Sequence, residues 1–291
     1  MDKVRISEER DIPALRRLWK VAFGDSEAYM DNFFHTYYRP ERMLVLEEEG
    51  EIRSMTAWFD TCFVVPGRGK YRAAYLYAVA THPESRGKGL AARLLSGSDQ
   101  YFRSLSIPVV TTVPAEPSLH KFFGANGFRE CFRLFQSKLV PEELPRIPER
   151  AEFQPLSPDE YGQLREKLLE DIPHIAYPED ALAYQAGCCA LSGGGLYGMQ
   201  TAAGPVILCG EGAGNKIFVI KEILGSPTAK RLGLGDLNRI LPAEQWYLRD
   251  PLSNSDKMTE GWQFAMLKWL DQEQQKGWNW ASTAYLGLAF D

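Results

Sequence analysis

Apolar residues in the first half of the chain recur with two spacings, the alternation typical of strands and the three-to-four-residue interval typical of helices. In the segment 11–23, for example, Leu15, Leu18 and Phe23 recur at helical intervals. The predicted elements are a strand at 3–7, helices at 11–23 and 26–38, a hairpin at 43–65 that turns at Glu49–Gly50, a strand at 69–81, a helix that ends near Ser106, a strand at 108–113, a helix at 117–126 and a closing segment at 127–140. Their order, βααβββαβαβ, is a mixed α/β pattern.

The predicted strand at 69–81 (GKYRAAYLYAVAT) contains few polar residues, which favours a central strand buried on both faces. It leads into the turn Arg86–Ala91 (RGKGLA) and then into a leucine-rich helix. A helix start exposes unpaired backbone N–H groups at the positive end of its dipole, and glycines there let a phosphate reach them. With the charges of Arg86 and Lys88, the turn predicts a pyrophosphate cradle. A glycine-rich turn with a purely structural role is the alternative.

This turn resembles motif A of the GNAT acetyltransferases, in which Arg/Gln-x-x-Gly-x-Gly/Ala follows a central strand. Arg86, Gly89 and Ala91 match that motif. The preceding VATHPES and the later FFGANGF at 122–128 also resemble family segments, and the order of elements is the family's. The resemblance covers residues 1–140. The GxxxxGK[ST] loop needs a longer glycine loop, and a dinucleotide fingerprint would open its fold, whereas this turn follows about 80 residues of strands and helices.

The resemblance implies a GNAT fold with a splayed central sheet, and acetyl transfer from acetyl-CoA to an amine that attacks the thioester directly. In the family, one strand edge holds the pantetheine arm and the turn holds the pyrophosphate. The strand-edge residues in matching positions are Val79, Ala80 and Thr81, and the turn residues are Arg86, Gly87, Lys88, Gly89, Leu90 and Ala91. A backbone N–H near Val79 would polarise the thioester carbonyl.

Two departures from the family pattern concern proton transfer. Phe123 stands where the family often has the tyrosine that protonates the thiolate, so we expect it only to contact the cofactor. The strand at 71–81 has no carboxylate to serve as base, although an alkyl ammonium with a pKa of about 10 must lose its proton. The candidates for the relay are His120, Glu116, Tyr75, Tyr77, a water chain and the chain terminus with Asp291. We select His120 and Asp291 as catalytic side chains, with a structural role as the alternative for each.

A linker divides the chain. Five prolines and many charges between Val140 and Pro158 predict an exposed segment with a domain boundary near residue 148. We therefore expect a GNAT domain that binds acetyl-CoA at 1–147 and a second domain at 148–291.

The second half contains a weaker copy of the glycine turn. At an offset of 144 positions, Lys230 aligns with Arg86, Gly233 with Gly89 and Gly235 with Ala91. This predicts an internal repeat, with a chance glycine turn as the alternative. The lysine in place of arginine, and Asp236 close by, predict a weakened CoA site, in which Glu222 is a candidate base.

The tandem arrangement resembles the enhanced-intracellular-survival acetyltransferases, in which a degenerate GNAT-like domain follows the working one. Those proteins have a further C-terminal domain, for which this chain is too short, and their C-terminal carboxylate enters the active site of the first domain. The segment LGLAFD is too apolar for a free tail, so we expect it to pack as a strand that ends at Asp291. The second domain is expected to shape the acceptor site.

The formal net charge of −5 is unevenly distributed. Residues 1–140 hold 20 Lys and Arg against 17 Asp and Glu (+3), and the remaining residues hold 13 against 21 (−8). A nucleic-acid binder would show a strong basic bias, so that class of protein is not expected. The acidic half favours a cationic amine acceptor, with two differently charged solvated surfaces as the alternative.

The remaining features indicate an ordinary globular protein of the cytoplasm. No apolar run approaches the roughly 18 residues of a membrane helix, and the charged start has no signal-peptide core. The five cysteines lack CxxC spacing and the four histidines are scattered, so neither disulfides nor a metal site is expected. The acceptor and the oligomeric state stay open. Two rival functions are a longer-acyl or aminoacyl transferase, and a CoA-binding or amine-sensing module without turnover.

Overall fold

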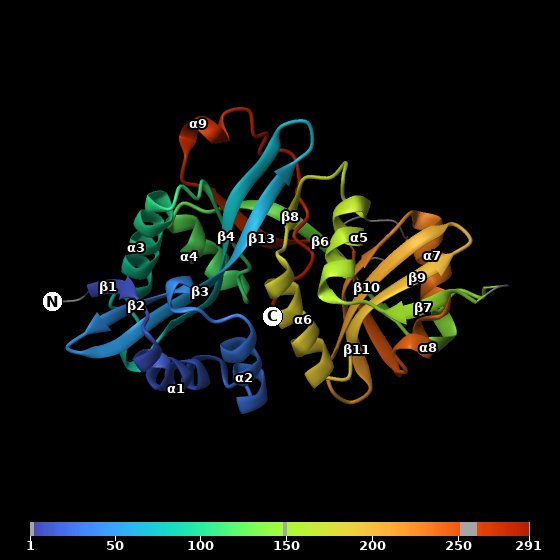
Figure 1. The fold of residues 1–291 in the computed structure, drawn as a ribbon, viewed down its shortest axis with the longest axis horizontal. Coiled ribbons are helices and arrows are strands. Elements are labelled where there is room, and N and C mark those ends of the chain that lie inside the picture. The colour runs from blue at the N-terminus through green and yellow to red at the C-terminus, as the bar shows by residue number, and fades with distance from the viewer. Residues whose placement is uncertain (1–2, 148–149, 251–260, 291) are drawn as a thin grey trace. The chain divides into compact units, whose positions relative to one another are not determined.

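A computed structural model describes residues 3–147, 150–250 and 261–290 of the 291-residue chain (Figure 1). The chain forms two compact units, and neither is continuous in sequence. The first unit comprises residues 1–64, 68–131 and 265–282, and the second comprises residues 65–67, 132–264 and 283–291. None of the described helices combines the length and the apolar composition that crossing a membrane requires.

The first unit is a mixed sheet covered by helices. Its elements are β1 (Lys3–Ile6), α1 (Ile12–Phe23), α2 (Glu27–Thr36), β2 (Met43–Glu48), β3 (Glu51–Val65), β4 (Gly69–Thr81), α3 (Leu90–Ser104), β5 (Val109–Thr112), α4 (Pro117–Ala125), β13 (Trp262–Trp269) and α9 (Gln272–Gln275). The strand order is β1-β2-β3-β4-β5-β13, with β4 and β5 parallel and the pairs β1–β2, β2–β3 and β5–β13 antiparallel. The predicted order of elements up to the closing strand is confirmed.

The predicted hairpin turn is also confirmed. Glu49 and Gly50 have φ values of 54° and 84°, and they connect β2 to β3 where Glu48 pairs with Glu51. Two consecutive residues with positive φ match the right-handed twist of the flanking strands. Figure 1 shows the long strand β3 beside the equally prominent β4.

The two faces of the first sheet are packed differently. One face meets α3 and α4 in an apolar cluster that includes Leu76, Leu94 and Phe123. The opposite face carries an aromatic cluster, in which Trp19 of α1 and Phe33 of α2 lie with their ring centroids 5.6 and 5.8 Å from that of Tyr77 on β4. Because successive side chains of β4 point to opposite faces, some of them pack against α3 and α4 and the others against α1 and α2.

The closing strand differs from the expectation that it completes the first domain. Most of β6 (Arg129–Leu139) belongs to the second unit, where it pairs antiparallel with β12 (Gln245–Asp250). The place beside β5 is taken by β13, whose Lys268 donates to Asp99 of α3 and, at 2.7 Å, to the carbonyl of Asn126. β6 therefore lies mostly in the second unit and β13 mostly in the first, and the domains expected at 1–147 and 148–291 stay a prediction.

The second unit repeats the architecture of the first. Its elements are β6, β7 (Glu152–Pro155), α5 (Pro158–Leu168), β8 (His174–Ala176), α6 (Glu179–Leu191), β9 (Gly195–Thr201), β10 (Gly204–Gly212), β11 (Ile217–Leu224), α7 (Pro227–Gly235), α8 (Leu237–Ile240) and β12. The strand order β7-β9-β10-β11-β12-β6 follows the plan of β1-β2-β3-β4-β5-β13, again with one parallel pair, β11–β12. The two sheets therefore have equivalent topologies, as the predicted internal repeat requires.

Residues 284–290 are buried, as expected of an apolar tail, but they do not form the expected strand. Only isolated bridges occur there, from Ala284 to Phe132 and from Tyr285 to His174. Side chains bind the tail carbonyls instead: Arg165 donates to that of Leu286, Tyr177 to those of Leu286 and Leu288, and Lys221 to that of Ala289, over 2.6–3.2 Å. Side-chain donors satisfy backbone groups that a ladder would otherwise pair. Asp291 lies outside the described residues.

A buried ion pair anchors this arrangement. Arg165 donates through Nε to both carboxylate oxygens of Glu222, at 3.0 and 3.1 Å, and the two side chains are 1% and 0% exposed. Burial lowers the pKa of Arg165, but Glu222, Tyr177 and Tyr285 together raise it by more, so the guanidinium stays charged. The hydroxyl of Tyr161 also donates to Glu222, at 2.8 Å, and burial raises the pKa of this tyrosine well above its usual value.

We expect Arg165→Met to lower the free energy of unfolding by about 3–5 kcal/mol, because it leaves the Glu222 carboxylate buried without its cation. The double variant R165M/E222L should recover part of that loss, since it removes both charges but leaves the Leu286 carbonyl and the Tyr161 hydroxyl without these partners. Urea denaturation followed by tryptophan fluorescence measures both effects. A single variant that is as stable as the double one would contradict this account.

Candidate functional site

The parallel pairing of β4 with β5 is short. It covers Ala73–Leu76 on β4 and Val109–Thr112 on β5, where β5 ends, whereas β4 continues to Thr81. The backbone of β4 beyond Leu76 therefore lies outside this ladder. One strand edge in the middle of the sheet is left open to pair with an extended ligand.

A bulge in β4 marks this point. Ala78 has a φ of 50°, which a residue with a β-carbon rarely adopts. Ala74, Leu76 and Val79 all pack against the cluster under α3, so the alternation of faces is inverted between Leu76 and Val79. The strand resumes beyond Ala78 with its side chains on exchanged faces.

Two buried hydroxyls on β3 hold the bulged segment. The Oγ1 of Thr56 donates to the carbonyl of Tyr77 at 3.3 Å, and the Oγ of Ser54 donates to that of Ala80 at 2.7 Å. Ser54 Oγ also lies 2.9 Å from the hydroxyl of Thr81. Both β3 side chains are fully buried, so these carbonyls are satisfied without water.

The glycine turn adjoins the end of the open edge. Gly87 and Gly89 have φ values of 77° and 78°, and α3 begins at Leu90. A β-carbon built on either glycine would meet no atom of the described residues within 4 Å, so the glycines serve the backbone conformation and their outer side is open. No side chain of the described residues caps α3 with a hydrogen bond, which leaves its first N–H groups for a ligand.

The predicted cofactor residues divide into two groups. Arg86 and Lys88 are exposed, and the Nε of Arg86 donates to the carbonyl of Thr81 at 3.3 Å, which links the turn to the strand end. Val79 is half-buried, whereas Ala80 and Leu90 are 5% and 2% exposed, so they can meet a ligand only through the backbone. The structure thus places the strand edge and the turn next to each other.

Phe123 and His120 on α4 have ring and hydrogen-bond partners on α4 itself and in the segment that follows it. Phe123 is 4% exposed and packs against Phe122 and Phe128 in the apolar cluster. The Nδ1 of His120 lies 2.9 Å from Glu130, so the hydrogen-bond partner found for this ring is a carboxylate and not the β4 edge. Both remain predictions as site residues.

The other relay candidates differ in position. Glu116 is exposed and accepts from Ser118 at 2.6 Å. Tyr75 is 2% exposed and stands where β4 is still paired with β5. Tyr77 is half-buried, and its hydroxyl lies 3.1 Å from that of Tyr29 on α2. Sequence reasoning missed Tyr29 and the bulge, because nothing local distinguishes Ala78 from Ala73 and Ala74, which are regularly paired in the same strand.

The second glycine segment does not form a comparable cradle. Ser226 caps α7, which begins at Pro227, so Gly233 and Gly235 lie inside a helix. Lys230 is 8% exposed and bound to Asp250 at 2.5 Å, and it is therefore not presented to a phosphate. The alignment at offset 144 thus joins segments of different local structure.

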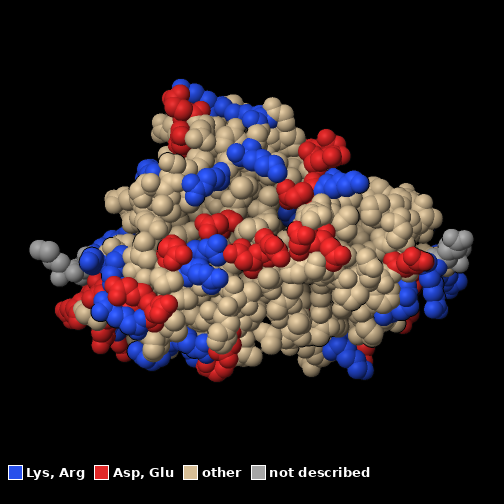
Figure 2. All heavy atoms as spheres, viewed as in Figure 1, with Lys and Arg blue, Asp and Glu red and all other residues tan. Residues whose placement is uncertain are grey.

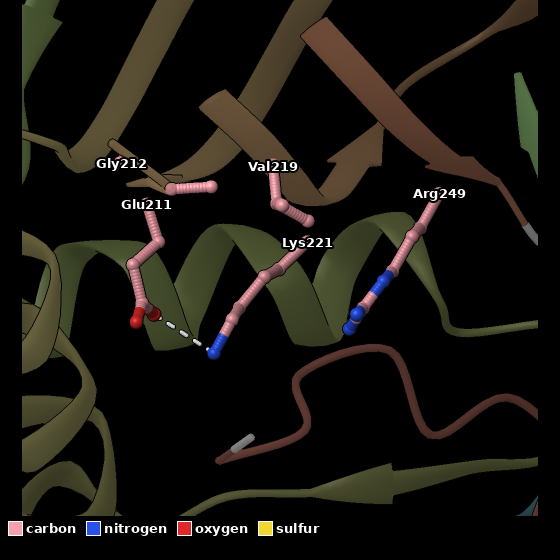
Figure 3. A pocket seen from close by; sticks show the side chains of 6 residues that line it. Glu211, Gly212, Val219, Lys221 and Arg249 are labelled. Carbon is pink, nitrogen blue, oxygen red and sulfur yellow. Dashed lines mark ion pairs between the residues drawn. The ribbon is translucent and has the colours of Figure 1, made fainter. Parts of the chain in front are cut away.

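The corresponding point between β11 and β12 in the second unit is lined by charged side chains. Their pairing ends at Ile220 and Leu248, and a pocket of about 150 Å³ begins there. Figure 3 shows Glu211, Lys221 and Arg249 extending from three neighbouring strands toward one side of the sheet. Lys221 binds Glu211 at 2.8 Å and the tail carbonyl of Ala289 at 3.0 Å. Glu222, the candidate base, is 0% exposed and bound to Arg165, which indicates a structural role for this carboxylate.

Charged side chains of both signs lie on the face that Figure 2 shows. Basic and acidic residues are interspersed there.

The comparison with known proteins finds GNAT proteins among those that share this fold. Residues 3–128 match the family model described as acetyltransferase (GNAT) domain. No curated protein sequence matches the chain. Among solved structures, a GCN5-related N-acetyltransferase from Anabaena variabilis has a TM-score of 0.72 at 14% identity, over 94% of this chain and 74% of that one. Eis1 from Mycobacterium abscessus has a TM-score of 0.68 at 13% identity, over 94% and 74% of the two chains.

A tandem arrangement is also found among these structures. A tandem GNAT protein from the clavulanic acid biosynthesis pathway has a TM-score of 0.56 at 12% identity, over 93% of this chain and 99% of that one. At such identities the likeness concerns the fold, and it extends over both halves of the chain.

We expect Gly89→Ala to lower the free energy of unfolding by about 1–2 kcal/mol, the cost of a left-handed conformation for a residue with a β-carbon. Gly89→Asn should cost less. The matched control is Gly124→Ala in α4, where φ is not positive and a β-carbon would meet no described atom within 4 Å. Urea denaturation distinguishes them, and equal effects of the two alanine variants would show that the turn does not need its positive φ.

Proposed function

We propose that this chain, whose residues 3–128 form a GNAT acetyltransferase domain, transfers an acetyl group from acetyl-CoA to an amine. The observation that carries the proposal is the junction of two features on one strand. β4 leaves its parallel neighbour after Leu76, and the same strand leads into a glycine turn whose outer side is open. An extended arm with a charged phosphate end matches this pair of features.

In this proposal the turn holds the pyrophosphate. The N–H groups at the start of α3 would donate to it, and the exposed side chains of Arg86 and Lys88 would supply positive charge. Leu90 and Ala91 would contribute their backbone, since the side chain of Leu90 belongs to the core. Phe123, which is buried in the same apolar cluster as Leu90, is also proposed to contact the cofactor.

The open edge of β4 would bind the pantetheine arm through Val79, Ala80 and Thr81. The N–H of Val79, next to the bulge, would donate to the thioester oxygen as negative charge develops on it. Loss of one such donor typically costs about 3–4 kcal/mol in the barrier. The amine attacks the thioester carbon directly, and no covalent enzyme intermediate is needed. His120 and Asp291 stay candidates for proton transfer.

The second unit is proposed to bind no acyl-CoA of its own. Lys230 is paired with Asp250, Gly233 and Gly235 lie inside α7, and Lys221 is bound to Glu211 and to the Ala289 carbonyl. We propose instead that the negative balance of residues 148–291 attracts a cationic acceptor, which the second domain helps to select.

We expect Arg86→Glu to raise the dissociation constant of acetyl-CoA at least tenfold, because it puts a negative charge beside the pyrophosphate. Arg103→Glu, at the far end of the same helix and also exposed, is the matched control and should change it less than twofold. Isothermal titration calorimetry measures both, together with a stoichiometry of one CoA per chain. Equal effects of the two variants would exclude the turn, and a stoichiometry of two would exclude a single site.

The charge proposal predicts a salt dependence. With acetyl-CoA saturating, kcat/KM for a polyamine should fall as ionic strength rises, since screening weakens long-range attraction. An aromatic amine that is neutral at pH 7 serves as the matched acceptor and should show a much smaller change. A panel of amines assayed by release of free thiol provides the measurement. A neutral acceptor that outperforms every cationic one would refute the charge proposal.

A further inference from the structure

Tyr77 is the first residue of β4 beyond the pairing with β5, which ends at Leu76. β5 ends at Thr112, opposite Leu76, whereas β4 continues to Thr81 and leads toward the glycine turn. A ligand with its phosphates at the turn and its arm along β4 therefore ends near Tyr77. On the proposed function, that end is the thioester.

The ring of Tyr77 is held on the face that α1 and α2 cover. Its centroid lies 5.6 Å from that of Trp19, 5.8 Å from that of Phe33 and 5.2 Å from that of Phe59. These three neighbours are at most 1% exposed, whereas Tyr77 is half-buried. A ring fixed on its inner sides and open at one edge presents its hydroxyl in a defined place.

The hydroxyl of Tyr77 has a proton-carrying partner. It lies 3.1 Å from the hydroxyl of Tyr29, which is half-buried at the start of α2. A phenol has a pKa of about 10 and is protonated at neutral pH, so it is in the form needed to give a proton to a departing thiolate. The second hydroxyl could then stabilise the phenolate by a charge-assisted hydrogen bond.

We propose that Tyr77 is the catalytic acid and proton relay of acetyl transfer, and that Tyr29 positions it; this inference rests on the proposed function. The amine nitrogen forms a bond to the thioester carbon, and the carbon–sulfur bond breaks. The phenolic proton of Tyr77 goes to the sulfur, which leaves as the free thiol. The phenolate then takes a proton from the attacking nitrogen, which restores Tyr77 and yields the neutral amide.

The first experiment compares Tyr77→Phe with Tyr75→Phe, two residues earlier on the same face of β4. Tyr77→Phe should lower kcat about 100-fold or more, the scale of acid–base effects, while the affinity for acetyl-CoA measured by calorimetry stays within twofold. Tyr75→Phe should lower kcat less than fivefold. The proposal is wrong if Tyr77→Phe binds acetyl-CoA and keeps the parental kcat, or if Tyr75→Phe causes the larger loss.

The second experiment separates acid catalysis from a structural effect. With the acetyl thioester of an aromatic thiol of low pKa, the leaving group needs no proton, so the loss in kcat/KM caused by Tyr77→Phe should shrink below tenfold. Tyr29→Phe should lower kcat about tenfold with acetyl-CoA and move the basic limb of its pH profile to higher pH, because loss of the hydrogen bond raises the pKa of Tyr77. Equal losses with both thioesters would overturn the role as acid.

The parental protein separates failure of this inference from failure of the proposed function. If it binds acetyl-CoA but releases no thiol with any amine, the proposed function fails and this inference fails with it. If it turns over and the Tyr77 variant does so equally well, only the relay is refuted.

Discussion

At Ala78 the backbone of β4 takes a φ of 50°, a conformation that costs a residue with a β-carbon about 1–2 kcal/mol. It is maintained by neighbours, because the hydroxyls of Thr56 and Ser54 bind the carbonyls on either side of it. This single torsion inverts the faces of the strand, so that Tyr77 lies with α1 and α2 while Val79 lies with α3. The open edge and the hydroxyl beside it both depend on that torsion.

The order of elements in the first unit follows from local patterns, which is why it could be predicted. Alternation, helical spacing and the Glu49–Gly50 turn are properties of neighbouring residues. The partner of a strand edge is not such a property. The choice of β13 over β6 beside β5 depends on contacts such as that of Lys268 with Asp99, which lie far apart in sequence. The domain boundary was placed by composition, and composition carries no information about pairing.

The candidate site shows the same division. The turn at 86–91 could be found because glycines, cations and a following helix are adjacent in sequence. The second glycine segment has a similar sequence, but Ser226 and Pro227 start its helix before the glycines. A serine cap followed by a proline in the first turn is a helix-start signal that the sequence alone provides. The burial of Lys230 could not be predicted in this way, because its partner Asp250 is distant in sequence. The Tyr29–Tyr77 pair likewise joins α2 to β4, and only the folded chain brings them together.

The pairing of β5 with β13 has a consequence for synthesis. Translation delivers β5 more than 140 residues before β13, the strand that pairs with its free edge. During that interval β5 can pair with β4 on one side, but its other edge has no partner in the nascent chain, and such an edge can recruit foreign strands. The sheet of the first unit therefore cannot be completed until β13 has been synthesised, by which time most of the second unit is also present.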